Sequence, residues 1–259
     1  MKNIIDRIFL TLLIFFPIAL VAEYSHTSSL IVFFLAALAI IPLAKYIGEA
    51  TEELAVYTGS ALGGLLNATF GNAAELLIGI FAIREGLVEV VKASITGSII
   101  GNLLLVAGMA MLAGGFKHKK QIFNKTGASA ASSTLLLAAI ALIMPAIFLQ
   151  TAPDVGSKII SELSIFVSVF MIVVYVASLL FVLYTHKHLY TQEVGKYEAK
   201  WSKTKSMLIL LIATLAVAWM SEILVGSIEP VVKVFGWTEL FIGVIFIAII
   251  GNEIGRAHV

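Results

Sequence analysis

Long apolar windows run through this sequence, and each is long enough to cross a lipid bilayer as a helix. A hydrocarbon core of about 30 Å requires roughly 20 apolar residues of α-helix. Seven complete windows and the start of an eighth meet this length, at approximately residues 8–24, 29–47, 62–83, 93–115, 129–150, 159–185, 206–226 and from 239 onward. Because a segment in lipid must satisfy its backbone hydrogen bonds internally, the sequence predicts an all-α, polytopic membrane helix bundle.

The composition agrees with a membrane protein. Of the 259 residues, 60% are hydrophobic and 13% are charged, whereas soluble domains carry about 25% charged residues. The net charge is only +1, and the basic residues occupy short segments between the windows, which argues against a nucleic-acid partner. The sequence has no cysteine, so disulfides, thiolate metal ligands and cysteine nucleophiles are excluded.

The basic residues between the windows predict the orientation. If the N-terminus is cytoplasmic, alternation of the spans places 13 of the 17 Lys and Arg residues on the cytoplasmic side. The exceptions are Arg84, Lys92, Lys158 and Lys233. This is the asymmetry that the positive-inside rule describes, so we expect a cytoplasmic N-terminus.

Glu75 places a carboxylate in the middle of the third window. A charged residue at the bilayer centre costs on the order of 2.5 to 3.5 kcal/mol on insertion scales, so it usually marks an ion or proton site. Asn72 precedes Glu75 by three residues and lies on the same face of a continuous helix. Further small and polar residues share this stripe, namely Asn67, Gly71 and Gly79.

The fourth window carries a second stripe of small and polar residues, formed by Ser94, Gly97, Ser98, Gly101, Asn102, Leu105 and Gly108. Close helix packing alone would explain the glycines. Packing does not explain the Ser98 hydroxyl or the Asn102 amide, because each needs a polar partner at membrane depth. If the two stripes face each other, Glu75, Asn72, Ser98 and Asn102 gather around one cavity near the bilayer midplane.

The oxygen atoms of this cavity predict a metal site. Carboxylate, amide and hydroxyl oxygens suit a hard cation such as Ca²⁺, with Na⁺ as the nearest competitor. The expected metal-binding set is Glu75, Asn72, Ser98, Asn102 and Gly71, and no cofactor is expected. Because Ca²⁺ takes six to eight oxygens, this set is incomplete, and we expect a second, related half of the protein to supply more.

The eighth window begins such a half. It ends in Gly251-Asn252, which repeats Gly71-Asn72, and it crosses the membrane in the opposite direction to the third window. This arrangement predicts inverted-topology repeats with an incomplete second repeat. The expected organisation is an N-terminal membrane half over 1–185, a cytoplasmic loop over 186–205, the start of the second repeat over 206–252 and a tail over 253–259.

Acidic residues outside the two stripes have two possible roles. Glu49, Glu52 and Glu53 follow the second window and either attract cations to the cytoplasmic mouth or form a solvated helix end. Glu222, late in the seventh window, either lines an outer vestibule or caps a helix. Histidines 186 and 188 are two residues apart, do not share a helix face and receive no site role.

Two runs of the sequence resemble the first signature repeat of the calcium/proton exchangers, a family of the calcium/cation antiporter superfamily. These runs are Gly63 to Leu76 and Ser94 to Leu104, supported by Ser221-Glu222 and by Gly236 to Gly243. The resemblance implies an eleven-span antiporter of a prokaryotic cell (inner) membrane, not an enzyme, with Ca²⁺, H⁺ and the lipid bilayer as partners. It also implies that cytosolic Ca²⁺ is exchanged for external H⁺ by alternating access, with Glu75 as the carboxylate that both ions share.

The sequence departs from this family after Asn252. The family continues Gly-Asn-x-x-Glu, whereas this chain continues Glu253-Ile254-Gly255-Arg256-Ala257-His258-Val259. We expect residues 253–259 to be a non-native tail, of the kind a sequencing adapter encodes. A sodium-coupled Ca²⁺ exchanger of the same superfamily and an inert fragment remain the alternatives, whereas the lack of a second intramembrane aspartate argues against a membrane-embedded hydrolase.

The predicted orientation can be tested with single cysteines in this cysteine-free chain. Lys120→Cys should resist a membrane-impermeant thiol reagent in intact cells, whereas Lys158→Cys should react, because the basic asymmetry places them on opposite sides. Both should react once the cells are permeabilised. Labelling of Lys120→Cys from outside intact cells would contradict the orientation.

Overall fold

The computed structural model describes residues 2–123, 125–152, 156–186 and 199–251. Within these ranges the chain forms helices and no strand, which confirms the all-α prediction. The chain divides into two compact units, of which one contains residues 1–120 with 198–259 and the other contains residues 121–197.

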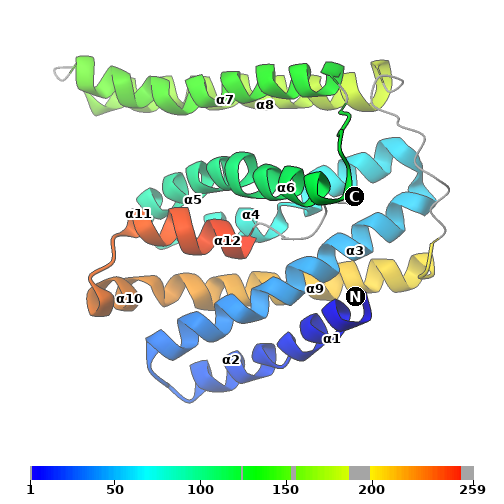
Figure 1. Ribbon diagram of the computed structural model, residues 1–259. Coiled ribbons are helices and arrows are strands. Elements are labelled where there is room, and N and C mark those ends of the chain that lie inside the picture. The colour runs from blue at the N-terminus through cyan, green and yellow to red at the C-terminus, as the bar shows by residue number, and fades with distance from the viewer. Residues whose placement is uncertain (1, 124, 153–155, 187–198, 252–259) are drawn as a thin grey trace. The chain divides into compact units, whose positions relative to one another are not determined.

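The larger unit contains most of the helices (Figure 1). Its first part consists of α1 (Lys2–Leu12), α2 (Phe15–Tyr24), α3 (Ser29–Phe70), α4 (Ala73–Arg84), α5 (Val88–Ile100), the π-helical stretch η1 (Gly101–Val106) and α6 (Ala107–Lys117). Its second part consists of α9 (Lys203–Gly226), α10 (Ile228–Phe235), α11 (Glu239–Phe241), the π-helical stretch η4 (Ile242–Ile247) and α12 (Ala248–Gly251).

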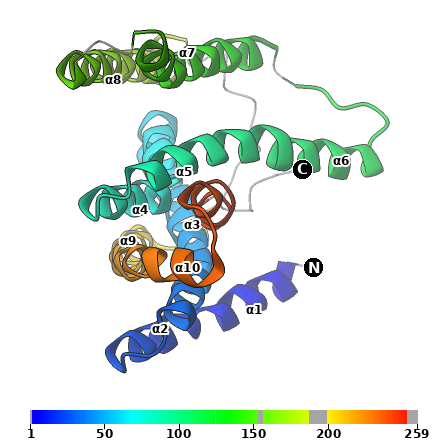
Figure 2. The ribbon, with the colours of Figure 1, turned by 90° about the vertical axis from the view of Figure 1, so that its left-hand side faces the viewer.

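The core of the larger unit lies between α3 and α9, which pack along each other, with α2 against α3 and α4 against α9 (Figure 2). Burying a large apolar side chain contributes about 1.5 to 3 kcal/mol to stability in water. In lipid, the stabilisation comes mainly from close packing of the side chains. The core side chains are aliphatic and aromatic, and they include Phe33, Ile40 and Ile47 on α3 and Val217, Met220 and Leu224 on α9.

The long helix α3 has one kink. Gly59 has φ 81° and ψ 169°, which is non-helical backbone inside the 42 residues of the helix. L-residues with a side chain rarely adopt positive φ, so glycine is the residue that allows the chain to change direction here. The segment that follows the kink leads directly into Gly71 and Asn72.

The smaller unit is a helical hairpin. It consists of α7 (Lys125–Thr151) and α8 (Ser157–Leu180), which contact each other, and a π-helical continuation η2 (Phe181–Thr185) (Figure 1). Both helices are apolar and largely exposed along their length, and both are long enough to cross a bilayer.

Six of the predicted membrane spans are found as helices of sufficient length and hydropathy. They are Asp6–Tyr24, Ser29–Gly59, Val88–Lys117, Lys125–Thr151, Lys158–Thr185 and Lys203–Phe235. The predicted eighth window appears as the shorter apolar helix Glu239–Gly251. The third window, 62–83, is not a continuous helix, because α3 ends at Phe70 and α4 begins at Ala73.

Candidate functional site

The break in the third window determines where Glu75 lies. The backbone N–H of Gly71 still donates to the carbonyl of Asn67 at 2.9 Å, but Asn72 has φ −113° and ψ 20° and starts a new helix. Glycine and asparagine are both weak helix formers, which explains why the helix stops at this pair. The expectation of one continuous helix through the third window is therefore wrong, although Asn72 and Glu75 still line the same cavity.

Glu75 consequently occupies the first turn of α4. The free backbone N–H groups and the positive end of the helix dipole lie at this terminus, and both favour a negative charge. Interrupted helices occur at membrane depth only where the freed backbone is buried in protein or lines a cavity. The break thus converts a costly carboxylate position into one with local electrostatic support.

The facing wall of the site comes from α5 and η1. The chain turns between α4 and α5 at Gly86, which has φ 78°, so the two helices pack side by side. Ser94, Ser98 and Asn102 follow one another at intervals of four residues, which places them on one face of a helix.

An open cavity of about 510 Å³ lies between these two walls. Its polar lining consists of Asn72, Glu75, Ser94, Ser98 and Asn102, and its remaining lining is apolar apart from Gly79, with Ile247 of η4 contributing. The structure therefore brings together the four side chains that the two stripes predicted to meet. Gly71 lies at the helix break and is not among the lining residues.

Two of the lining oxygens are buried atoms. Oε2 of Glu75 and Oγ of Ser98 are both inaccessible from the surface, and the Ser98 hydroxyl has no hydrogen-bond partner among the described residues. A buried hydroxyl without a partner costs about 1 to 3 kcal/mol. A cation in the cavity would satisfy that oxygen.

Ser94 extends the polar face beyond the predicted ligand set. Its side chain is 8% exposed and lines the same cavity one helical turn before Ser98. The position of Ser94 in the stripe of the fourth window indicated that it faces the cavity, but a serine at helical spacing is equally typical of close helix packing. With Ser94 included, the lining supplies one carboxylate, two amides and two hydroxyls, which is a donor set for a hard cation.

The C-terminal helices of the larger unit contact this site directly. The chain after α10 returns along α5, and α11, η4 and α12 all contact that helix (Figure 1). A Cβ on Gly97 would lie 2.6 Å from the carbonyl oxygen of Val244, and a Cβ on Gly243 would lie 2.5 Å from Cβ of Ala93. The two glycines therefore let α5 and η4 approach to backbone contact. Gly251 is described, whereas Asn252 lies outside the described residues.

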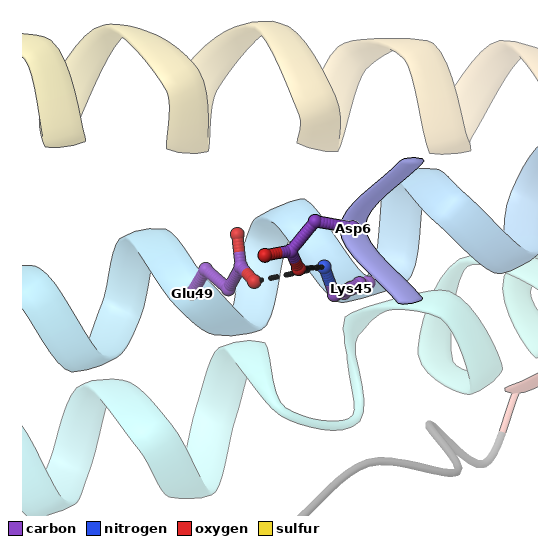
Figure 3. A network of polar contacts seen from close by, with 3 residues as sticks. All are labelled: Asp6, Lys45 and Glu49. Atoms are coloured by element: carbon purple, nitrogen blue, oxygen red, sulfur yellow. Dashed lines mark hydrogen bonds and ion pairs between the residues drawn. The ribbon is translucent and has the colours of Figure 1, made fainter. Parts of the chain in front are cut away.

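Glu49, one of the predicted vestibule carboxylates, belongs to an ion-pair network between helices. Nζ of Lys45 lies 2.9 Å from Asp6 on α1 and 3.0 Å from Glu49 on α3 (Figure 3). The lysine side chain is 16% exposed, so the network ties α1 to α3 in a partly buried position. Exposed ion pairs contribute about 0 to 1 kcal/mol, and this range applies here because the Asp6 side chain is 51% exposed.

Glu53 also makes structural contacts. Its Oε2 accepts hydrogen bonds from the backbone N–H groups of Lys200 and Trp201 at 2.7 and 3.0 Å, and the residue is 4% exposed. The Tyr57 hydroxyl donates to the Trp201 carbonyl at 2.5 Å. These bonds fasten α3 to the segment before α9. Glu52 is half-buried on α3 and Glu222 is exposed on α9, and neither lines the cavity.

Comparison with known proteins places the chain in a family. The model of the sodium/calcium exchanger protein family matches residues 28–184 and 205–254. The Ca²⁺/H⁺ antiporter of Aphanothece halophytica is 43% identical over 95% of this chain and 70% of its own length. The Ca²⁺/H⁺ antiporter ChaA of Bacillus subtilis is 44% identical over 93% of this chain and 70% of its own length.

A solved structure agrees. The crystal structure of the selenium-substituted Ca²⁺/H⁺ antiporter protein YfkE is similar with a TM-score of 0.79 and 41% identity, covering 96% of this chain and 70% of that one. The helices, their order and the cavity between α4 and α5 thus define a helical membrane transport protein. The chain belongs to the sodium/calcium exchanger protein family.

The close contact between α5 and η4 can be tested with two alanine substitutions. Gly97→Ala should lower the unfolding temperature, because its Cβ would lie 2.6 Å from a backbone oxygen and overpacking costs about 1 to 3 kcal/mol. Gly108→Ala is the matched control, since a Cβ there meets nothing within 4 Å and alanine favours helix by about 1 kcal/mol. Thermal unfolding in detergent measures both. Equal effects of the two substitutions would contradict the packing described here.

Proposed function

We propose that this protein exchanges Ca²⁺ for H⁺ across a membrane by binding the two ions in turn at Glu75. The observation that carries the proposal is the cavity at the break between α3 and α4, where a carboxylate, two amides and two hydroxyls converge. The names of the relatives support Ca²⁺ and H⁺ as the ions, because those proteins are Ca²⁺/H⁺ antiporters.

The oxygens of the cavity have different roles in binding Ca²⁺. Glu75 supplies negative charge, and the side-chain oxygens of Asn72, Ser98 and Asn102 replace water molecules of the hydrated ion. Ser94 lies one helical turn away, where its hydroxyl oxygen can replace a water molecule of the hydrated ion as the ion enters or leaves. Because one carboxylate neutralises a divalent cation only in part, the complete shell needs another acidic ligand beyond these residues.

Competition between the ions follows from the same carboxylate. Ca²⁺ and H⁺ bind to the same carboxylate oxygens of Glu75, so the two ions exclude each other. Ca²⁺ binds only after the proton has left, and a proton binds only after Ca²⁺ has left. The site therefore changes its exposure with one ion or the other, and exchange requires no covalent chemistry.

Access alternates when one part of the protein moves relative to another around the site. The Gly59 kink and the Gly71-Asn72 break bound a short helical segment between them, and the glycine contacts of η4 hold the second repeat against α5. We further propose that the N-terminus is cytoplasmic, on the basis of the distribution of Lys and Arg residues, and that the membrane is a prokaryotic cell membrane.

Sodium coupling is the competing function within the family. The cavity oxygens suit Na⁺ as well as Ca²⁺, because both are hard cations. The proposal of proton coupling rests on the names of the relatives and on the carboxylate of Glu75, which gives the cavity a proton-binding group. A transport assay with separate proton and sodium gradients distinguishes the two.

Glu75→Gln tests the proposal. Since this chain spans 70% of the B. subtilis relative, the assay uses a chimera of residues 1–251 followed by the remaining part of that relative. Glutamine keeps the shape but removes the charge, so ⁴⁵Ca²⁺ uptake driven by a pH gradient into inverted vesicles should fall at least about 100-fold, as loss of one partner from a buried charge pair costs roughly 3 kcal/mol or more.

Glu222→Gln, at an exposed position on α9 outside the cavity, serves as the matched control and should keep uptake within about twofold. Near-normal uptake by Glu75→Gln would refute the assignment of the site. Uptake driven by a sodium gradient, with none driven by the pH gradient, would favour the sodium-coupled alternative.

A further inference from the structure

The end of α12 lies against the side chain of Glu75. A Cβ on Gly251 would lie 2.6 Å from Cγ, 2.8 Å from Cδ and 3.2 Å from Oε1 of Glu75. Contacts shorter than 3.0 Å essentially never occur for a real Cβ atom. With Glu75 in its observed conformation, therefore, only glycine fits at position 251.

Backbone conformation does not explain this glycine. The residues with positive φ among the described glycines are Gly59, Gly86 and Gly236, and Gly251 is not one of them. Gly251 is also fully inside the protein rather than in a solvent-exposed turn. The position requires glycine because of the space next to it, and the atoms that fill this space belong to Glu75.

The contact is held by the packing on either side. Gly97 and Gly243 bring η4 to backbone contact with α5, and Ile247 of η4, which has no exposed surface, lines the cavity that contains Glu75. Because α12 continues directly from η4, its position relative to α4 is fixed by these contacts. The backbone of Gly251 is thus held in a fixed position beside the carboxylate of Glu75.

We propose that Gly251 is a positioning residue for the cation-binding carboxylate of Glu75. Its missing side chain leaves the space in which Cγ and Cδ of Glu75 lie, so the helix that begins the second repeat sets the direction of the ligand in the first repeat. The inference rests on the proposed function, since it assigns Gly251 a role in the binding of Ca²⁺ by Glu75.

A side chain at position 251 would change this direction. Cγ and Cδ of Glu75 would have to rotate away from α12, and the carboxylate oxygens would leave their present place beside the amides and hydroxyls of the cavity. Aspartate at position 75 is one methylene shorter, which withdraws the carboxyl group by about 1.5 Å. The shorter acid should therefore tolerate a Cβ at position 251 better than glutamate does.

A double-mutant cycle in the chimera tests the proposal. Gly251→Ala should raise the Ca²⁺ concentration for half-maximal uptake by about 10- to 100-fold, which is the range that a misplacement of about 1 Å costs at a reacting centre. Glu75→Asp should also weaken binding. The double variant should bind at least about fivefold more tightly than the product of the two single effects, because residues in contact are not additive.

Two further glycines separate positioning from general packing. Gly97→Ala also disturbs η4, but its Cβ would meet the backbone of Val244 rather than Glu75, so Glu75→Asp should not relieve its effect. Gly108→Ala, where a Cβ meets nothing within 4 Å, should leave the half-maximal concentration unchanged.

If Gly251→Ala fails to fold, the yield of monodisperse protein replaces uptake as the readout. Glu75→Ala in the same chain should then restore folding, because it removes the atoms that clash, and failure to restore it would overturn the proposal.

Unchanged Ca²⁺ dependence in Gly251→Ala, or single effects that simply multiply, would also overturn the proposal. The proposed function is judged separately by Glu75→Gln. If Glu75→Gln abolishes uptake while the cycle shows no coupling, Gly251 has no positioning role and the proposed function stands. If the unmodified chimera takes up no Ca²⁺, both proposals fail together.

Discussion

The cost of a carboxylate inside a membrane is the constraint on which the rest of this structure depends. Glu75 lies within a window of apolar residues, where an ionised acid is expensive unless dipoles, hydrogen bonds or a cation stabilise it. The break at Gly71 and Asn72 reduces the energy of this charge, because it puts Glu75 in the first turn of α4, at the positive end of the helix. The polar face of α5 and η1 supplies further oxygens across a cavity of about 510 Å³. In the proposed function, a cation or a proton supplies what remains.

Glycine residues allow the C-terminal helices η4 and α12 to reach this site. Gly97 and Gly243 let α5 and η4 come into backbone contact, and Gly251 brings the end of α12 against Glu75. A single methyl group at any of these glycines would prevent the contact, because it would overlap a neighbouring atom. Interfaces of this kind occur in membrane helices because lipid offers no hydrophobic driving force, so close packing must provide the stability. Here the same packing also fixes the surroundings of the carboxylate.

The sequence predicted the membrane spans and the polar side chains of the cavity from local patterns. Window length revealed six spans that the structure confirms, and helical spacing predicted that Asn72, Glu75, Ser98 and Asn102 would meet. The break in the third window was not predicted, because Leu62 to Ile83 is as apolar as a continuous span and the Gly-Asn pair affects it only locally. The contact between Gly251 and Glu75 could not be predicted either, since spacing does not tell which faces of distant helices meet. Glu53 shows the same limit, because its partners are backbone groups more than a hundred residues away.

Proton release on Ca²⁺ binding tests the central claim most directly, because the claim is that both ions compete for one carboxylate. The chimera is titrated with Ca²⁺ by calorimetry in buffers of different ionisation enthalpy, at several pH values. Binding of Ca²⁺ should release protons, and the apparent affinity should rise with pH. The Glu75→Gln variant should release at least one proton fewer for each Ca²⁺ that still binds. Release of the same number of protons by both proteins, or an affinity that does not change with pH, would contradict the account.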